Sequence, residues 1–135
     1  MPVLSIQLKE IVANKKSDAG GNVEINNKVG ESDVKERNMP NLGQKGLAIE
    51  FRYLTEYKKE EEIVAEIKMT GEVLYIGEDC KLILDTWKKD GVLPEDQHVQ
   101  IVNTIFRRCA IKALVLAEDL QLPPPIGLPF AKKNE

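Results

Sequence analysis

Histidine and cysteine, the residues that most often hold metals or act as nucleophiles, are nearly absent from this sequence. Its 135 residues include one histidine, His98, and two cysteines, Cys80 and Cys109. The cysteines form no CxxC pair, and His98 does not stand at metal-ligand spacing from them, so a structural zinc site is not expected. We expect both cysteines to be small core residues in a reducing compartment, and His98 to be a solvated helix residue.

Phosphate-binding loops and carboxylates placed for catalysis are missing as well. Neither a P-loop nor a GxGxxG motif occurs. Acid–base catalysis needs carboxylates that are desolvated in a cleft, whereas Glu60-Glu61-Glu62 falls in an expected turn and Glu118-Asp119 at an expected helix end. We therefore expect a protein that is not an enzyme and that requires no cofactor.

Long apolar runs and clustered positive charge are also lacking. No stretch approaches the roughly 20 apolar residues of a membrane span, so membrane insertion is not expected. The residues after Met1 do not form a basic region followed by an apolar core, so a signal peptide is not expected either. The net charge is −3, which argues against general nucleic-acid binding. We expect a cytoplasmic protein. The basic cluster Arg107, Arg108 and Lys112 is either the solvent edge of a helix, the commoner arrangement, or a contact for RNA, as on a ribosome, or for an acidic partner.

What is present is the composition of one globular domain spanning residues 1–135, with 42% hydrophobic and 30% charged residues. Alternating apolar and polar residues predict strands over 3–12 and, more weakly because of Asn26-Asn27, over 23–29. The charged, turn-rich segment 30–45 is expected to be a mobile or partner-facing loop.

The clearest strand is the third, at about 47–57, and a fourth follows at 63–76. A short charged turn joins them, which predicts a long antiparallel hairpin, and Gly71 marks a kink or bulge in its second arm. One face of the third strand is expected to carry Leu47, Ile49, Phe51, Tyr53, Thr55 and Tyr57.

After the fourth strand, apolar residues no longer recur at every second position but at the three- to four-residue spacing of a helix. Residues 79–90 predict a short helix with Asp79 at its N-cap and Gly91 as its stop. A long helix follows from Pro94 to about Leu120, with an apolar face wider than one sheet contact needs. An apolar, proline-rich tail closes the chain over 121–131, in an extended course.

The order of these elements resembles the SecB export-chaperone fold, in particular small archaeal SecB-like proteins. The best local match is Gly71-Glu72-Val73-Leu74-Tyr75-Ile76-Gly77, like the end of the family's fourth strand. The short helix with Cys80, the proline that opens the long helix, the Arg108-Cys109 step and the proline-containing tail follow in the family's order. The expected fold is therefore α+β: a four-stranded antiparallel sheet followed by a short and a long helix packed on one face, with an extended proline-rich C-terminal tail.

The resemblance implies an ATP-independent holdase, with a link to protein export, that binds unfolded polypeptide in apolar grooves. It also implies a homo-oligomer, a dimer or tetramer, joined through first strands and long helices. The residues that we expect to bind polypeptide are Tyr53, Tyr57, Met69, Leu122, Ile126, Leu128 and Phe130. Those that we expect at the oligomer interface are Ile6, Leu8, Ile101, Ile105 and Leu114.

Two alternatives accompany this hypothesis. For Tyr53 and Tyr57, a place in the sheet's core is about as well supported as client contact, and for Phe51 the core is favoured. The function could also be that of a non-enzymatic binding subunit with one dedicated partner, such as a ribosome, a toxin–antitoxin pair or a secretion complex.

Overall fold

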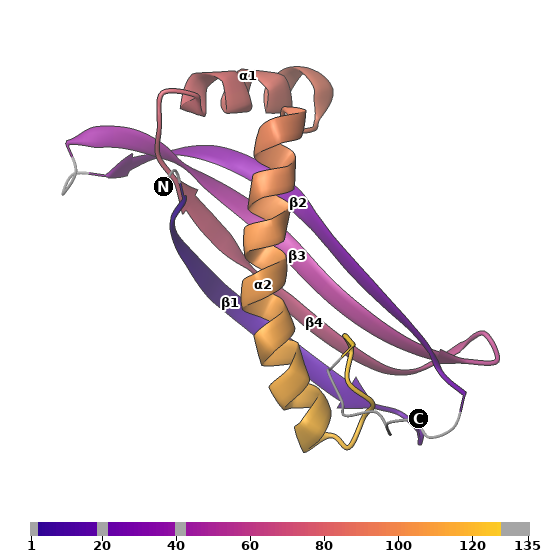
Figure 1. Ribbon diagram of the computed structural model, residues 1–135. Coiled ribbons are helices and arrows are strands. Elements are labelled where there is room, and N and C mark those ends of the chain that lie inside the picture. Colours follow the sequence, from indigo (N-terminus) through magenta and orange to yellow (C-terminus); the bar gives the residue numbers. More distant parts are fainter. Residues whose placement is uncertain (1–2, 19–21, 40–42, 128–135) are drawn as a thin grey trace, which may run out of the picture.

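A four-stranded antiparallel sheet carries one long helix across it and a short helix at one end (Figure 1). The computed structural model describes residues 3–18, 22–39 and 43–127. The strand order is β1-β4-β3-β2, so β1 and β2 are the two edges of the sheet. The elements are β1 Val3–Lys15, β2 Glu24–Met39, β3 Gln44–Lys59, β4 Glu62–Tyr75, α1 Cys80–Asp90 and α2 Glu95–Asp119.

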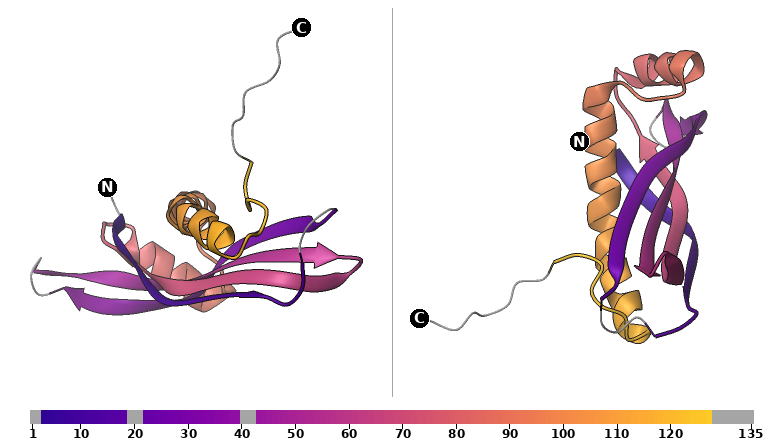
Figure 2. Two further views of the ribbon diagram at one scale, coloured as in Figure 1. Left: turned by 90° about the horizontal axis from the view of Figure 1, so that it is seen from below. Right: turned by 90° about the vertical axis from the view of Figure 1, so that its right-hand side faces the viewer.

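The long helix α2 and the segment after it lie on the same side of the sheet (Figure 2). The core forms between this helix and the inward-facing residues of β3 and β4, because the alternation along these strands places every second side chain beneath α2. The predicted face of β3 is confirmed, since all six of its residues are buried. The predicted α+β fold is therefore the observed one.

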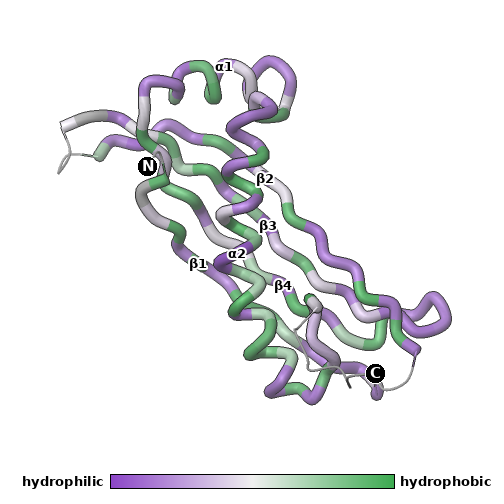
Figure 3. Tube along the Cα trace, viewed as in Figure 1, coloured by the Kyte–Doolittle hydropathy of each residue, from purple (hydrophilic) through white to green (hydrophobic). Residues whose placement is uncertain are grey.

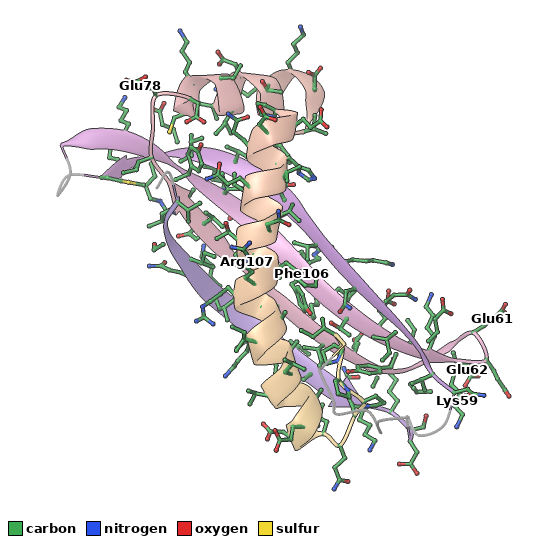
Figure 4. The ribbon with its side chains drawn as sticks, in the orientation of Figure 1. Lys59, Glu61, Glu62, Glu78, Phe106 and Arg107 are labelled. Carbon is green, nitrogen blue, oxygen red and sulfur yellow. The ribbon has the colours of Figure 1, made fainter. Side chains whose placement is uncertain are left out.

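The β3–β4 hairpin turns at Glu60 and Glu61, and both residues have a positive φ, 52° and 68°. This is the backbone of a two-residue turn with both central residues left-handed, for which asparagine and glycine are the usual choices. A bulge follows at Val64, because Lys58 pairs with Ile63 while Tyr57 pairs with Ala65. The expected hairpin is thus present, and its charged tip lies at one end of the sheet (Figure 4).

Gly71 is a point of close approach between two strands. A Cβ at this position would lie 2.1 Å from the backbone oxygen of Gln7 on β1. The register shift lies in β1, between Leu8 and Glu10, rather than in β4. The irregularity expected at Gly71 is therefore a bulge in the neighbouring strand β1, and the missing side chain of Gly71 makes room for it.

The largest difference from the sequence prediction is β2. Residues 30–39 were expected to lie in a loop, and they continue the strand, paired with β3 from Glu24 to Met39. Charged residues do not break the strand, because β2 is an edge strand whose side chains can reach solvent. Ion pairs with the neighbouring strand stabilise it where apolar burial does not. Lys28 contacts Glu56 at 3.0 Å, and Lys35 lies 3.8 Å from Glu50.

The helix ends follow the predicted boundaries but not always the predicted chemistry. Asp79 is the N-cap residue of α1, yet its side chain makes no cap hydrogen bond. Its Oδ2 instead accepts from the Tyr75 hydroxyl at 2.6 Å and from Gln97 Nε2 at 3.0 Å, which ties β4 to the first turn of α2. Gly91 ends α1 in a left-handed conformation, as expected.

Candidate functional site

The candidate site is the place where the chain beyond α2 crosses the helix-covered face of the sheet. We call residues Leu122–Gly127 the strap; it has neither helical nor strand structure. The reversal that begins the strap is a Schellman motif, in which Leu122 N–H donates to Ala117 O at 2.8 Å and Gln121 N–H to Glu118 O at 3.1 Å. Leu122 is buried, and with Ala117 it lines one pocket. The strap therefore starts from a fixed point and turns back onto the sheet (Figures 1 and 2).

Two side chains of the sheet hold the strap by its main-chain carbonyls. The Tyr57 hydroxyl on β3 donates to Pro123 O at 2.6 Å. The Asn27 side chain on β2 donates through Nδ2 to Pro125 O at 2.8 Å. The main chain of the strap is thus bound across β3 and β2 through groups that every residue possesses, rather than through particular side chains.

The Asn27 amide is oriented by a buried hydroxyl. Thr55 Oγ1 lies 2.6 Å from Asn27 Oδ1 and 3.1 Å from the Tyr53 hydroxyl, and both Thr55 and Tyr53 are fully buried. Because Oδ1 accepts from Thr55, Nδ2 is turned toward the strap. We call Asn27, Tyr53, Thr55 and Tyr57 the carbonyl-binding cluster.

Burial keeps the tyrosines of this cluster in their neutral, donating form. Burial raises the pKa of Tyr57 to about 12, with a smaller contribution from nearby Tyr53, and burial also raises the pKa of Tyr53. The Tyr53 ring packs against Phe106 of α2, with ring centroids 6.2 Å apart. The cluster therefore offers hydrogen-bond donors at any physiological pH.

Apolar surface gathers next to the strap. A pocket of about 330 Å³ lies between the strap and the last turns of α2, lined by Leu114, Val115, Ala117, Glu118, Leu122 and Pro124. On the outer side of α2, Ile111 is 67% exposed and Val115 48%. Figure 3 shows hydrophobic residues concentrated along this C-terminal half of α2. On the β1 edge, Ile11 and Val12 are 41% and 39% exposed.

The residues expected to bind polypeptide divide into three groups. Tyr53, Tyr57 and Met69 are fully buried in the core. Their apolar surfaces therefore do not meet a client in this arrangement, although Tyr57 reaches the strap through its hydroxyl. Leu122 is buried in the strap and Ile126 half-buried. Leu128 and Phe130 lie outside the described residues.

The residues expected at an oligomer interface are likewise separated by burial. Ile101 and Ile105 are fully buried on the inward face of α2, because this face of the helix covers its own sheet. Both stay predictions as interface residues, although their side chains are not exposed within one subunit. Ile6 and Leu8 on β1 and Leu114 on α2 are half-buried and stay predictions.

Sequence reasoning missed the polar part of the site. Asn27 was interpreted only as a residue that weakens a strand, and Thr55 only as part of a core face. The one available signal was Asn26-Asn27 itself, a polar pair within an otherwise apolar alternation. Nothing in the sequence links Asn27 to Pro125, 98 residues further on.

The other residues singled out earlier do not form a second centre. His98 is not merely solvated, because its Nδ1 lies 2.7 Å from Oε1 of Glu31 on β2. Cys109 is buried and Cys80 half-buried, both free. Burial raises the pKa of Cys109 to about 11 and that of Cys80 as well, which disfavours the reactive thiolates.

Two further findings concern the described part of the chain. Within it, no group of three or more His, Cys, Asp or Glu side chains is placed to hold a metal ion. Neither α1 nor α2 has the length and apolar character that a membrane-crossing helix requires.

The architecture is that of SecB-like proteins. A structure of the SecB-like chaperone Rv1957 of Mycobacterium tuberculosis, in complex with a ChAD peptide from the Rv1956 HigA1 antitoxin, aligns with 98% of this chain and 91% of that chain. The TM-score is 0.58 and the sequence identity 12%, so the likeness is one of fold. That protein is bacterial, so the expected likeness to archaeal members in particular has no support here. No family model and no curated protein matches the sequence.

Proposed function

We propose that this protein is an ATP-independent holdase that binds extended segments of non-native polypeptides. The observation that carries this proposal is the shared fold: nearly the whole chain aligns with a chaperone that, in its own structure, holds a peptide. We further propose a cytoplasmic protein without enzymatic activity or cofactor, in keeping with the scarcity of histidine and cysteine in the sequence.

The uncovered apolar surface supports the proposal. Ile111 and Val115 lie on the outer side of α2, and the strap pocket lies beside them. Apolar groups of unfolded chains would gain burial against this surface at about 25 cal/mol per Å² of apolar area removed from water. Such contacts are non-directional, which suits clients of varied sequence.

A homo-oligomer, a dimer or tetramer, belongs to the same proposal. The β1 edge presents unpaired backbone groups together with Ile11 and Val12, and exposed edges of this kind pair readily with another strand. A second copy placed against β1 and the outer side of α2 would bury both surfaces. A link to protein export would supply clients as unfolded precursors.

The test is suppression of aggregation by purified protein without nucleotide. A chemically unfolded client is diluted into buffer with and without the protein, and light scattering is recorded. The proposal predicts that scattering falls at near-stoichiometric ratios and that added ATP changes nothing. An unchanged scattering curve at a several-fold excess would contradict it.

A binding subunit with one dedicated partner is the second candidate. The observation in its favour is that the similar chaperone holds a peptide of one particular antitoxin. In that case general suppression of aggregation would be absent, and one partner would co-purify in fixed ratio. Reversing the charge of Arg107, Arg108 and Lys112 should then abolish that complex and leave the circular dichroism spectrum unchanged, because Arg107 and Arg108 are exposed.

A further inference from the structure

The strap is bound in the manner of a peptide ligand rather than as part of the core. Its two described hydrogen bonds to the sheet, from Tyr57 and from Asn27, both end on main-chain carbonyls, two residues apart. Leu122 and Pro125 are buried, while Pro124 and Gly127 are exposed. A short proline-rich segment that is held by its carbonyls and buries every third residue resembles a peptide docked on a folded surface.

Proline suits this site for a specific reason. The carbonyl-binding cluster meets the strap with donors, the Tyr57 hydroxyl and Asn27 Nδ2. Residues 123, 124 and 125 are all proline and carry no N–H. These three residues therefore bring acceptors to the donors and no amide that would need an acceptor in return. Proline also restricts the free segment to extended conformations, which lowers the entropy lost on binding.

The cluster itself is built on the sheet independently of the strap. Thr55 is fully buried and fixes the Asn27 amide, and Tyr57 is fixed by burial of its ring. Among the described residues, the backbone hydrogen bonds that anchor the strap are those of the Schellman turn, from Gln121 and Leu122 to the end of α2. The receptor would therefore persist with the strap displaced, and its donors would then be available to another chain.

From this arrangement we propose that the strap is a displaceable internal occupant of a binding site for extended, proline-containing apolar segments of client polypeptides. The client segment takes the place of residues 122–127, and its carbonyls receive the hydrogen bonds of Tyr57 and Asn27. This inference rests on the proposed polypeptide-binding function and names the segment class and the regulation of that function. A client binds only those molecules whose strap is displaced. Its apparent affinity is therefore the intrinsic affinity multiplied by the fraction of such molecules.

The first test uses the full chain and a labelled peptide of residues 121–127, Gln-Leu-Pro-Pro-Pro-Ile-Gly, which contains the strap. A loosened variant, Leu122→Ser with Ile126→Ser, weakens the strap and leaves the carbonyl-binding cluster intact. Fluorescence anisotropy should show the peptide binding this variant at least about tenfold more tightly than it binds the wild type. The matched control is Leu82→Ser, an exposed position on α1, which should bind as the wild type does.

The second test examines the receptor and the role of proline. Adding Asn27→Asp to the loosened variant removes the amide donor and should abolish binding of the peptide, and adding Tyr57→Phe should weaken it. A peptide with alanine in place of the first and third prolines should bind at least severalfold more weakly. Equal affinity of the loosened variant and the wild type, or indifference to Asn27→Asp, would overturn the inference.

A measurement on the wild type covers the case in which the loosened variant does not fold. During titration with excess unlabelled peptide, the methyl resonances of Ile126 should move toward their positions in a free peptide, and the Asn27 side-chain amide should keep a bound-like shift. Ile126 resonances that stay fixed at saturating peptide would overturn the inference.

The aggregation assay separates the two proposals. In one outcome, the wild type suppresses aggregation but the loosened variant binds the peptide no better than the wild type does. That outcome would contradict the strap inference and leave the holdase function standing. A loosened variant that binds the peptide, with no chain suppressing aggregation, would leave the strap site standing and remove the holdase function.

Discussion

Gln121, the residue that turns the chain from α2 into the strap, adopts a conformation that side chains disfavour. Its φ is +55°, at the position of the Schellman motif that glycine usually occupies. A left-handed conformation costs a non-glycine residue roughly 1–2 kcal/mol. Glycine avoids this conformational cost. Part of the resulting gain in stability is lost, because glycine loses more conformational entropy on folding than other residues do.

Gln121→Gly should therefore raise the free energy of unfolding by about 0.5–1 kcal/mol. Urea denaturation followed by circular dichroism measures the change. Gln121→Ala is the control, because it removes the side-chain amide and keeps the strained backbone, and it should give no gain. A gain of the same size for alanine would mean that the strain is not the cause.

Glu72 is the most buried carboxylate of the polar sheet face, with its side chain 3% exposed. Arg37 Nη2 donates to its Oε2 at 3.2 Å, Arg37 Nη1 bonds the other oxygen, and Lys9 Nζ lies at 3.1 Å. The hydrogen bonds from Arg37 lower the pKa of Glu72 below its usual 4.5, against burial, which raises it. Since this pKa is lower in the folded than in the unfolded chain, the stabilisation is complete above pH 4.5 and is lost as the pH falls through the folded value.

Glu72→Gln should lower the free energy of unfolding by about 1–2 kcal/mol at pH 7, less than for a fully buried pair because Arg37 and Lys9 reach solvent. The difference from the wild type should shrink as the pH falls below 4.5, where the wild type loses the same interaction. Glu36→Gln is the control: its pair with Lys45 is exposed, and removing it should cost under about 0.5 kcal/mol. A pH-independent difference would contradict this account.

At the scale of elements, the tip of the β3–β4 hairpin carries avoidable strain. Glu60 and Glu61 both have positive φ, in a turn that favours Asn-Gly. Replacing Glu60 by Asn and Glu61 by Gly should raise the free energy of unfolding by about 1–2 kcal/mol, observed as a higher midpoint in urea. Glu62→Gln, which removes a charge beside the turn without changing its backbone, should give no comparable gain. If it does, charge repulsion rather than strain is the cause.

The elements that the sequence predicted are those in which burial has a clear period. β3, β4, α1 and α2 each bury every second residue or one helical stripe, so their alternation predicts them. β2 continues to Met39 because it pairs with β3 and its charged side chains form ion pairs, Lys35 with Glu50 on β3 and Arg37 with Glu72 on β4. The sequence of β2 alone does not reveal these partners. The candidate site shows the same limit, since Asn27 becomes a strap-binding group only once Thr55 and Pro125 are beside it.

At the scale of the whole molecule, Ile111 on the outer side of α2 tests the proposed oligomer. At 67% exposed, it contributes little to the stability of one subunit. Ile111→Glu should therefore leave the circular dichroism spectrum of the folded subunit unchanged and convert the wild-type dimer or tetramer to monomer, measured as solution mass by light scattering. Leu82→Glu, on the exposed side of α1, is the matched control and should keep the wild-type mass. A wild type that is already monomeric would contradict the oligomer proposal.

The measurement that tests the central claim most directly is equilibrium binding of a soluble, permanently unfolded client. A reduced and carboxymethylated model protein is titrated into the native protein without nucleotide, and the heat of binding is recorded. We expect saturable binding at a near-stoichiometric ratio, with a negative heat-capacity change from apolar burial, and no binding of the same client in its folded, disulfide-intact form. Absence of binding to the unfolded client, or equal binding of its folded form, would contradict a holdase.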